Sequence, residues 1–234
     1  MVVPESECVS LVQKTLLRLA LLWGLSPQAI IAADHNSSRW EKSIARYEAA
    51  DRKQMPAPGG ILFIGSSSIR RWTSLKNDFA DFQVLNRGFG GSHIADSVHF
   101  AKRIVHPYKP RQIVLYAGDN DVAAGKSPET VFADFQQFVK VVHKELPKSR
   151  ISFIAIKPSL SRWRLSGKMA KTNALVRDAC TKDERLDYID IWQPMLGGNH
   201  KPKPDLFVRD GLHINDKGYS LWTTLVKPRL TEYR

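Results

Sequence analysis

The sequence predicts an α/β fold in which a five-stranded parallel sheet lies between two layers of helices. Short apolar runs recur along the chain, and each is continuous rather than alternating with polar residues, which is typical of strands buried on both faces. Segments with the apolar spacing of helices separate these runs. The 234 residues are enough for one buried core, and no repeat, low-complexity tract or internal linker divides them. The alternation therefore favours a doubly wound domain.

The expected elements follow one another in regular order. The strands are predicted at residues 61–64, 83–86, 112–116, 151–156 and 186–191. The helices are predicted at residues 38–54, 69–76, 94–105, 128–146, 164–182 and 215–231. The first helix places Trp40, Ile44 and Tyr47 on one face, and Pro56 ends it. With the flavodoxin-like strand order 2-1-3-4-5, the first three strands are neighbours, so the segments that follow them converge on one crevice.

The N-terminal segment is expected to be separate from the single domain at residues 34–234. Residues 16–33 are too short and too interrupted for a membrane span but resemble the apolar part of an export signal, with Lys14 and Arg18 as the positive flank. Residues 1–33 are therefore predicted to be a signal peptide or, alternatively, an N-terminal helix packed on the domain. We expect an exported protein, periplasmic or extracellular, without stable membrane insertion; a cytoplasmic location is the alternative.

Charge and cysteine content restrict the possible partners. Lys and Arg outnumber Asp and Glu by 35 to 23, and this positive field would attract anionic surfaces. The basic residues are scattered along the chain and form no nucleic-acid motif, so a solvated surface and no nucleic-acid partner are expected. Only Cys8 and Cys180 are present, which gives neither a disulfide framework nor a zinc-binding pair. No metal or other cofactor is expected, and the oligomeric state stays open.

Three polar or glycine-rich segments follow the first three predicted strands. They are GSSS at 65–68, NRGFGGSH at 86–93 and AGDND at 117–121. Each one alone could be a turn, or a cap for the helix that begins near Pro128. Together, at adjacent strand ends, they offer a hydroxyl group, a backbone that a ligand can approach closely and a side-chain amide donor. These are the parts of a site for acyl transfer.

A general base is expected from the segment RDGLHIND at 209–216. Asp210 and His213 lie three residues apart, so the carboxylate can accept the Nδ1 proton and leave Nε2 free to take a proton from a serine. Alternatively, His213 or Asn215 is only a cap for the last helix. His93 also lies close to the predicted site and is a second candidate base.

The four segments occur in the order and approximate spacing of the blocks of the SGNH (GDSL-type) hydrolases. From residue 60 onwards the chain resembles the branch similar to platelet-activating-factor acetylhydrolase catalytic subunits. The resemblance implies a three-layer α/β/α flavodoxin-like fold and ester hydrolysis without a metal. It implies Ser67 as nucleophile, Asp210 and His213 as its partners, and an oxyanion hole made by Ser67, Gly91 and Asn120.

The first block departs from the family pattern at one position. The family's Gly-Asp-Ser falls on Gly65, Ser66 and Ser67, so a serine stands where the aspartate is usual. Ser66 therefore remains an alternative nucleophile. The motif G-x-S-x-G is absent because its fifth position is Ile69, which argues against the nucleophile elbow of α/β-hydrolases.

We therefore expect a serine esterase that acts on short-chain esters, acetyl esters above all, of a small molecule or carbohydrate. Trp163 and residues 193–209 follow later strands and are predicted to border the substrate, although they could simply be packed loops. No long apolar insertion that could form a lid is visible. The alternatives are an acyltransferase with the same three residues and a non-catalytic carbohydrate-binding module. A nucleotide or flavin binder is disfavoured, because neither a Walker loop nor the G-x-G-x-x-G spacing is present.

Overall fold

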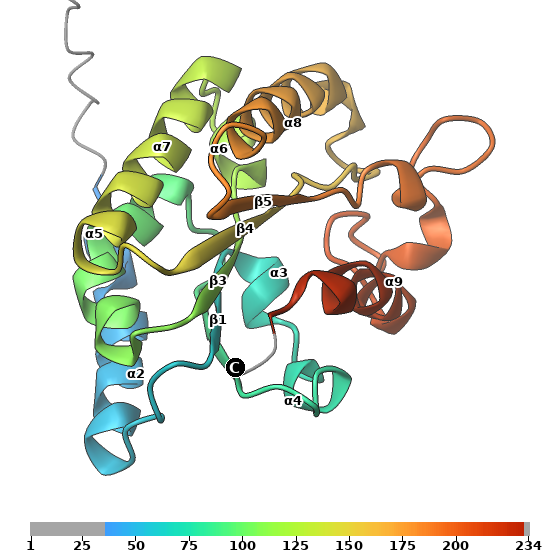
Figure 1. Cartoon of the computed structure of the whole chain (residues 1–234). Coiled ribbons are helices and arrows are strands. Elements are labelled where there is room, and N and C mark those ends of the chain that lie inside the picture. Colours follow the sequence, from blue (N-terminus) through green and yellow to red (C-terminus); the bar gives the residue numbers. More distant parts are fainter. Residues whose placement is uncertain (1–35, 232–234) are drawn as a thin grey trace, which may run out of the picture. The chain divides into compact units, whose positions relative to one another are not determined.

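Five parallel strands form the centre of the computed structural model, which describes residues 36–231 (Figure 1). The predictions for residues 1–33 lie outside the described residues. The strands are β1 (Ile61–Gly65), β2 (Val84–Gly88), β3 (Gln112–Tyr116), β4 (Arg150–Ile154) and β5 (Leu186–Ile189). Their order across the sheet is β2-β1-β3-β4-β5. The predicted fold class and the predicted strand order are both confirmed.

The register of the sheet brings the ends of the first three strands level with one another. Gly65 at the end of β1 is paired with Gly88 of β2 and with Tyr116 of β3. Because the strands are parallel, their carboxyl ends lie at the same edge. The three polar segments that follow them therefore start side by side.

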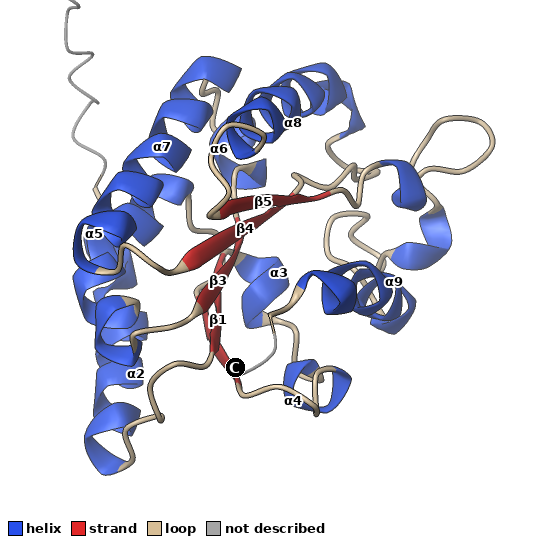
Figure 2. Cartoon of the chain, in the orientation of Figure 1, coloured by secondary structure: helices blue, strands red, loops and turns tan. Residues whose placement is uncertain are grey.

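Helices cover both faces of the sheet, as Figure 2 shows. One face carries α2 (Glu41–Lys53), α5 (Ile94–Ile104), α7 (Pro128–Glu145) and α8 (Ser166–Cys180). The other carries α3 (Ser67–Arg70), α4 (Leu75–Asp78) and α9 (Asp216–Val226). The remaining elements are α6 (Asp119–Ala123) and the short 3-10 helices η1 (Ser38–Trp40), η2 (His106–Tyr108), η3 (Trp163–Leu165), η4 (Gln193–Met195), η5 (Pro204–Leu206) and η6 (Lys227–Arg229).

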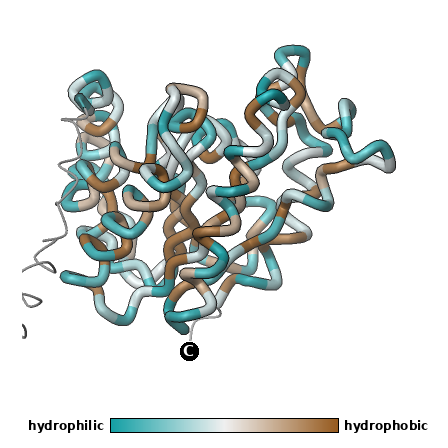
Figure 3. Tube along the Cα trace, turned by 90° about the horizontal axis from the view of Figure 1, so that it is seen from above, coloured by the Kyte–Doolittle hydropathy of each residue, from teal (hydrophilic) through white to brown (hydrophobic). Residues whose placement is uncertain are grey.

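The core has two parts because successive side chains of a strand point to opposite faces of the sheet. In β1, Leu62 and Ile64 belong to the cluster under α5 and α7, whereas Ile61 and Phe63 belong to the cluster under α3 and α9. All four are buried. The apolar residues accordingly concentrate along the central strands, as seen from above in Figure 3. A continuous apolar run is thus what a strand between two helical layers requires.

The predicted helix at 69–76 is wrong, because the chain forms two short helices there, α3 and α4. The turn between them lets the Trp72 ring pack edge-on against Phe63 and Phe79, where it is buried. Asp78 accepts hydrogen bonds from Trp72 Nε1 at 2.6 Å and from Ser74 Oγ at 2.7 Å. Tertiary burial of one large side chain therefore outweighs the local helical preference.

The segment after β3, for which a turn or a cap of the helix near Pro128 was considered, begins a short helix of its own. Gly118 has φ +108°, and a Cβ atom there would lie 2.6 Å from Ile156 Cδ1. Glycine allows the chain to turn sharply against Ile156, so α6 starts directly at Asp119. The helix α7 has its own cap, since Ser127 Oγ accepts a hydrogen bond from Thr130 N at 3.1 Å.

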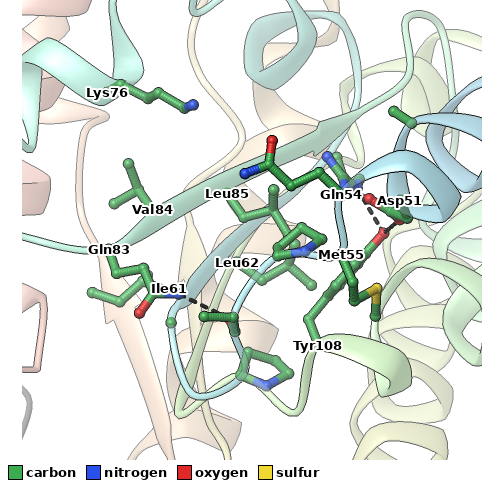
Figure 4. A pocket seen from close by; sticks show the side chains of 16 residues that line it. Asp51, Gln54, Met55, Ile61, Leu62, Lys76, Gln83, Val84, Leu85 and Tyr108 are labelled. Atoms are coloured by element: carbon green, nitrogen blue, oxygen red, sulfur yellow. Dashed lines mark hydrogen bonds and ion pairs between the residues drawn. The ribbon is translucent and has the colours of Figure 1, made fainter.

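A pocket of about 570 Å³ lies at the amino ends of β1 and β2, the sheet edge opposite to the three polar segments (Figure 4). Asp51, Arg87 and Tyr108 line part of this pocket. Tyr108 Oη donates to the Asp51 carboxylate at 2.5 Å, and Arg87 forms an ion pair with the same carboxylate. These polar groups therefore satisfy one another within the protein. Among residues 36–231, no helix has both the length and the apolar character needed to cross a membrane.

Candidate active site

Of the three serines after β1, only the middle one is partly exposed. Gly65 has φ +132°, and a Cβ atom there would lie 1.9 Å from Tyr116 O, so only glycine fits the end of this strand. Ser66 N then donates to Tyr116 O at 2.9 Å, and Ser67 begins α3. Ser66 and Ser68 are 2% and 1% exposed, whereas Ser67 is half-buried.

His213 connects Ser67 to Asp210. His213 Nε2 lies 3.1 Å from Ser67 Oγ, and His213 Nδ1 lies 2.6 Å from Asp210 Oδ2. Ser67 and His213 are 146 positions apart in the chain, and the fold brings them into contact at the carboxyl edge of the sheet. The arrangement is that of a serine nucleophile, a histidine base and a carboxylate that orients the base.

The turn before α9 holds the Asp210 carboxylate in place. Its Oδ1 accepts hydrogen bonds from Leu212 N at 2.8 Å and from His213 N at 2.9 Å. Burial by itself would raise the pKa of Asp210, but the hydrogen bonds from the His213 ring and from these two backbone groups outweigh it and lower the pKa below its usual range. An ionised Asp210 favours a proton on Nδ1 and leaves Nε2 to accept from the serine hydroxyl. Asn215, not His213, caps α9 through Gly218 N at 3.1 Å.

His93, the second candidate base, has a different environment. It is the N-cap of α5, and His93 N donates to Asp96 Oδ2 at 2.7 Å. Its Nδ1 lies 3.9 Å from Asp121 Oδ1. The histidine that contacts Ser67 Oγ is His213.

Asn120 reaches across to the segment that carries Gly91. Asn120 lies in the first turn of α6, and its Nδ2 donates to Ser92 O at 3.1 Å. Gly91 has φ +80° in the loop between β2 and α5. An amide nitrogen carries two hydrogens, so one remains for another acceptor. The structure therefore brings together the ends of β1, β2 and β3 as the sequence predicts.

Arg162 fixes the orientation of the Asn120 amide, and the sequence did not single it out. Arg162 Nη1 donates to Asn120 Oδ1 at 3.1 Å and to Asp119 Oδ1 at 2.5 Å. The other carboxylate oxygen of Asp119 accepts from Lys157 Nζ at 2.6 Å. Burial would raise the pKa of Asp119, but the charges of Lys157 and Arg162 outweigh burial and lower it. Asp119 is thus an ionised, buried anchor for Arg162.

Trp163, which directly follows Arg162, stacks on a second tryptophan. Its ring centroid lies 6.2 Å from that of Trp192 at an interplanar angle of 29°, and both residues are half-buried. The preceding segment contacts the turn of the candidate base, because Ser161 N donates to Gly211 O at 3.1 Å and Leu160 packs against Gly211. The role of Trp163 in binding a substrate stays a prediction.

The short helix η1 (Ser38–Trp40) also contacts the site, which the sequence did not reveal. Arg39 Nη2 donates to Gly91 O at 3.3 Å. A Cβ atom on Gly91 would lie 3.2 Å from the Trp40 ring. The pattern of residues 38–54 predicted that Trp40 faces a core but could not identify its neighbour, because that contact joins segments about 50 residues apart.

Comparison with known proteins identifies the family. Residues 64–221 match the profile of the GDSL-like lipase/acylhydrolase family. Among solved structures, a Streptococcus pneumonia protein named for platelet activating factor superposes with a TM-score of 0.75 at 17% identity, covering 94% of this chain and 99% of the other. The structure of an acetyl esterase variant, S10A with acetate ion, superposes with a TM-score of 0.56 at 15% identity, covering 73% of this chain and 95% of the other. A carbohydrate esterase of family 3 from Talaromyces cellulolyticus superposes with a TM-score of 0.58 at 14% identity, covering 73% of this chain and 95% of the other.

These identities show likeness of fold. No curated protein sequence matches the chain. The family profile, however, spans more than half of the 234 residues and includes each of the four segments named above. The chain therefore belongs to the GDSL-like lipase/acylhydrolase family, a family of ester hydrolases.

Proposed function

We propose that this chain hydrolyses short-chain carboxylic esters, acetyl esters above all, with Ser67 as the nucleophile. The observation that carries the proposal is the continuous contact from Ser67 Oγ to His213 Nε2 at 3.1 Å and from His213 Nδ1 to Asp210 at 2.6 Å. A serine hydroxyl is a weak nucleophile unless a base takes its proton, and an oriented histidine is such a base.

The reaction follows from these contacts in two halves. Ser67 Oγ attacks the carbonyl carbon while its proton passes to His213 Nε2, and Asp210 stabilises the imidazolium that forms. The tetrahedral intermediate collapses, and the leaving alcohol takes the proton from Nε2. Water then attacks the acyl-enzyme and gives a proton to Nε2, the acid departs, and Ser67 regains its hydroxyl hydrogen.

The negative charge of the tetrahedral intermediate needs donors near Ser67 Oγ. We assign this role to the backbone N–H groups of Ser67 and Gly91 and to the Asn120 amide. Asn120 Nδ2 uses one hydrogen for Ser92 O at 3.1 Å, and its second hydrogen is available to a substrate oxygen. We call residues 89–92, which carry Gly91, the oxyanion loop.

Two observations support a small acyl group and a carbohydrate or other small alcohol. An acetyl esterase and a carbohydrate esterase are among the structures with this fold. In addition, the half-buried rings of Trp163 and Trp192 stack near the segment that holds Arg162, and tryptophan rings pair an apolar face with a polar edge. A sugar ring presents the same combination of surfaces.

The test is a series of aryl esters from acetyl to palmitoyl, assayed with the wild type and with Ser67→Ala, Ser66→Ala and His213→Ala. We expect the highest kcat/KM for the acetyl ester, and a loss of about 10⁴- to 10⁶-fold in kcat for Ser67→Ala. Ser66→Ala is the matched control, because it removes the neighbouring hydroxyl group and should retain activity. An active Ser67→Ala would overturn the proposal. Recovery of the acyl group as an ester of an added alcohol, in place of free acid, would make the chain a transferase.

A further inference from the structure

Two arginines lie against consecutive residues of the oxyanion loop. Arg39 Nη2 donates to Gly91 O at 3.3 Å. The Arg70 side chain runs along Gly90, where its Nε lies 2.6 Å and its Cζ 3.1 Å from the position that a Cβ atom on Gly90 would occupy. Since Gly91 N–H is assigned to the substrate carbonyl oxygen, both guanidinium groups lie against the loop that would bind the reacting carbonyl.

Within the part of the chain that the structure describes, no acidic side chain neutralises these two arginines. Both residues are exposed, and no carboxylate within residues 36–231 pairs with either of them. The Arg39 guanidinium lies 4.7 Å from the centroid of the Trp40 ring, a contact that positions the charge without cancelling it. Arg162, in contrast, is paired with Asp119 at 2.5 Å.

Gly90 makes this arrangement possible. The distances from its Cβ position to Arg70 are too short for a real Cβ atom, so any larger residue at this position would displace the guanidinium. Because the atoms in the way belong to the far end of a flexible side chain, such a substitution would move the charge without unfolding the loop. Gly90 therefore gives a means to shift Arg70 while leaving its charge on the protein.

We propose that Arg39 and Arg70 form an anion subsite beside the oxyanion loop, and that the preferred substrates are esters whose alcohol part carries a carboxylate or phosphate group. This inference rests on the proposed function, in which the acyl group is acetyl. An acetyl group carries no charge and does not extend beyond the reacting carbonyl, so the anionic group must belong to the alcohol part of the ester. Planar guanidinium groups bind carboxylates and phosphates through paired hydrogen bonds.

The test compares matched anionic and neutral acetyl esters. Acetylated glucuronate against acetylated glucose tests a carboxylate, and 1-acetylglycerol 3-phosphate against 1-acetylglycerol tests a phosphate. For the wild type at low salt, we expect kcat/KM to favour the anionic ester of at least one pair by about 5- to 10-fold, and to fall toward parity as salt screens the charges. The pair that shows the preference identifies the anion.

The variants separate a local subsite from the general positive field. Arg70→Gln should reduce the anionic preference to about 2-fold or less, Arg70→Lys should retain part of it, and Arg70→Glu should favour the neutral ester. Gly90→Ala should also reduce the preference although the net charge is unchanged. Arg71→Gln is the matched control, because Arg71 is the exposed neighbour of Arg70 and carries the same charge.

Binding to the Ser67→Ala protein provides a readout that does not need turnover. Quenching of tryptophan fluorescence should report the anionic ester, since the Trp40 ring adjoins Gly91. Equal affinities and equal kcat/KM values for both members of each pair would overturn the anion subsite, while Ser67-dependent cleavage of the neutral esters would still support the proposed function. An equal loss of preference in Arg71→Gln would also overturn it, because the effect would then be one of net charge. Cleavage of no ester by the wild type would instead refute the proposed function.

Discussion

Replacement of Arg162 by methionine should lower kcat by weakening the hold on the Asn120 amide. The amide is fixed at both ends, with Oδ1 accepting from Arg162 Nη1 at 3.1 Å and Nδ2 donating to Ser92 O at 3.1 Å. A flipped amide would direct its oxygen toward the carbonyl of Ser92 and toward the substrate oxyanion. Arg162→Met removes one of the two contacts that oppose this flip and leaves the other.

The expected magnitude follows from the strength of that contact. A hydrogen bond to a charged group contributes about 1.5–3 kcal/mol. The Arg162 side chain is 21% exposed, so solvent reduces the contribution to about 1–2 kcal/mol, which corresponds to about 5- to 30-fold in kcat. The loss should stay below that of Asn120→Ala, which removes the donor and should cost about 10²- to 10³-fold.

The assay is steady-state hydrolysis of an aryl acetate by wild type, Arg162→Met, Asn120→Ala and the double variant. If Arg162 acts through Asn120, Arg162→Met should change kcat less than 2-fold when Asn120 is already absent, since coupled residues are not additive. KM should change little, and Arg162→Lys should recover part of kcat. Additive losses in the double variant, or an unchanged kcat in Arg162→Met with an unchanged Tm, would refute this reasoning.

Three further outcomes are expected. Asp210→Asn should lower kcat by about 10⁴-fold. Because the pKa of Asp210 is lowered in the fold, its contribution to stability is complete above the pKa of an unfolded aspartate and is lost in acid. The free energies of unfolding of wild type and variant, measured in urea, should therefore converge as the pH falls. Gly65→Ala should prevent soluble expression or sharply lower Tm, since its Cβ atom would lie 1.9 Å from Tyr116 O; a wild-type Tm would contradict the strand-end geometry. Burial raises the pKa of the half-buried Cys180 thiol to about 12, so in a Cys8→Ala background iodoacetamide at pH 8 should label it much more slowly in the native chain than after unfolding. Equally rapid labelling of the native and the unfolded chain would contradict the raised pKa.

Local sequence patterns were sufficient to predict the elements whose structure is set by which of their faces are buried and which face solvent. The run ILFIG forms β1 because both of its faces are buried, and the spacing of residues 128–146 forms α7 because one of its faces is buried. The helix predicted at 69–76 failed because burial of the Trp72 ring among distant aromatic residues decides the chain path there. No local pattern carries that information.

Local sequence patterns indicated the fold class and the residues at the strand ends, because periodicity and glycine placement depend on neighbours in the chain. The strand order was expected from the flavodoxin-like fold, and the structure confirms it. The distances between Ser67, His213 and Asp210 were set by the folding of the chain. So were the contact of Arg162 with Asn120 and the positions of Arg39 and Arg70 along residues 89–92. Apart from the His213–Asp210 pair, which lies within one turn, these contacts join segments far apart in the chain, so they form only when the sheet and its helices pack together.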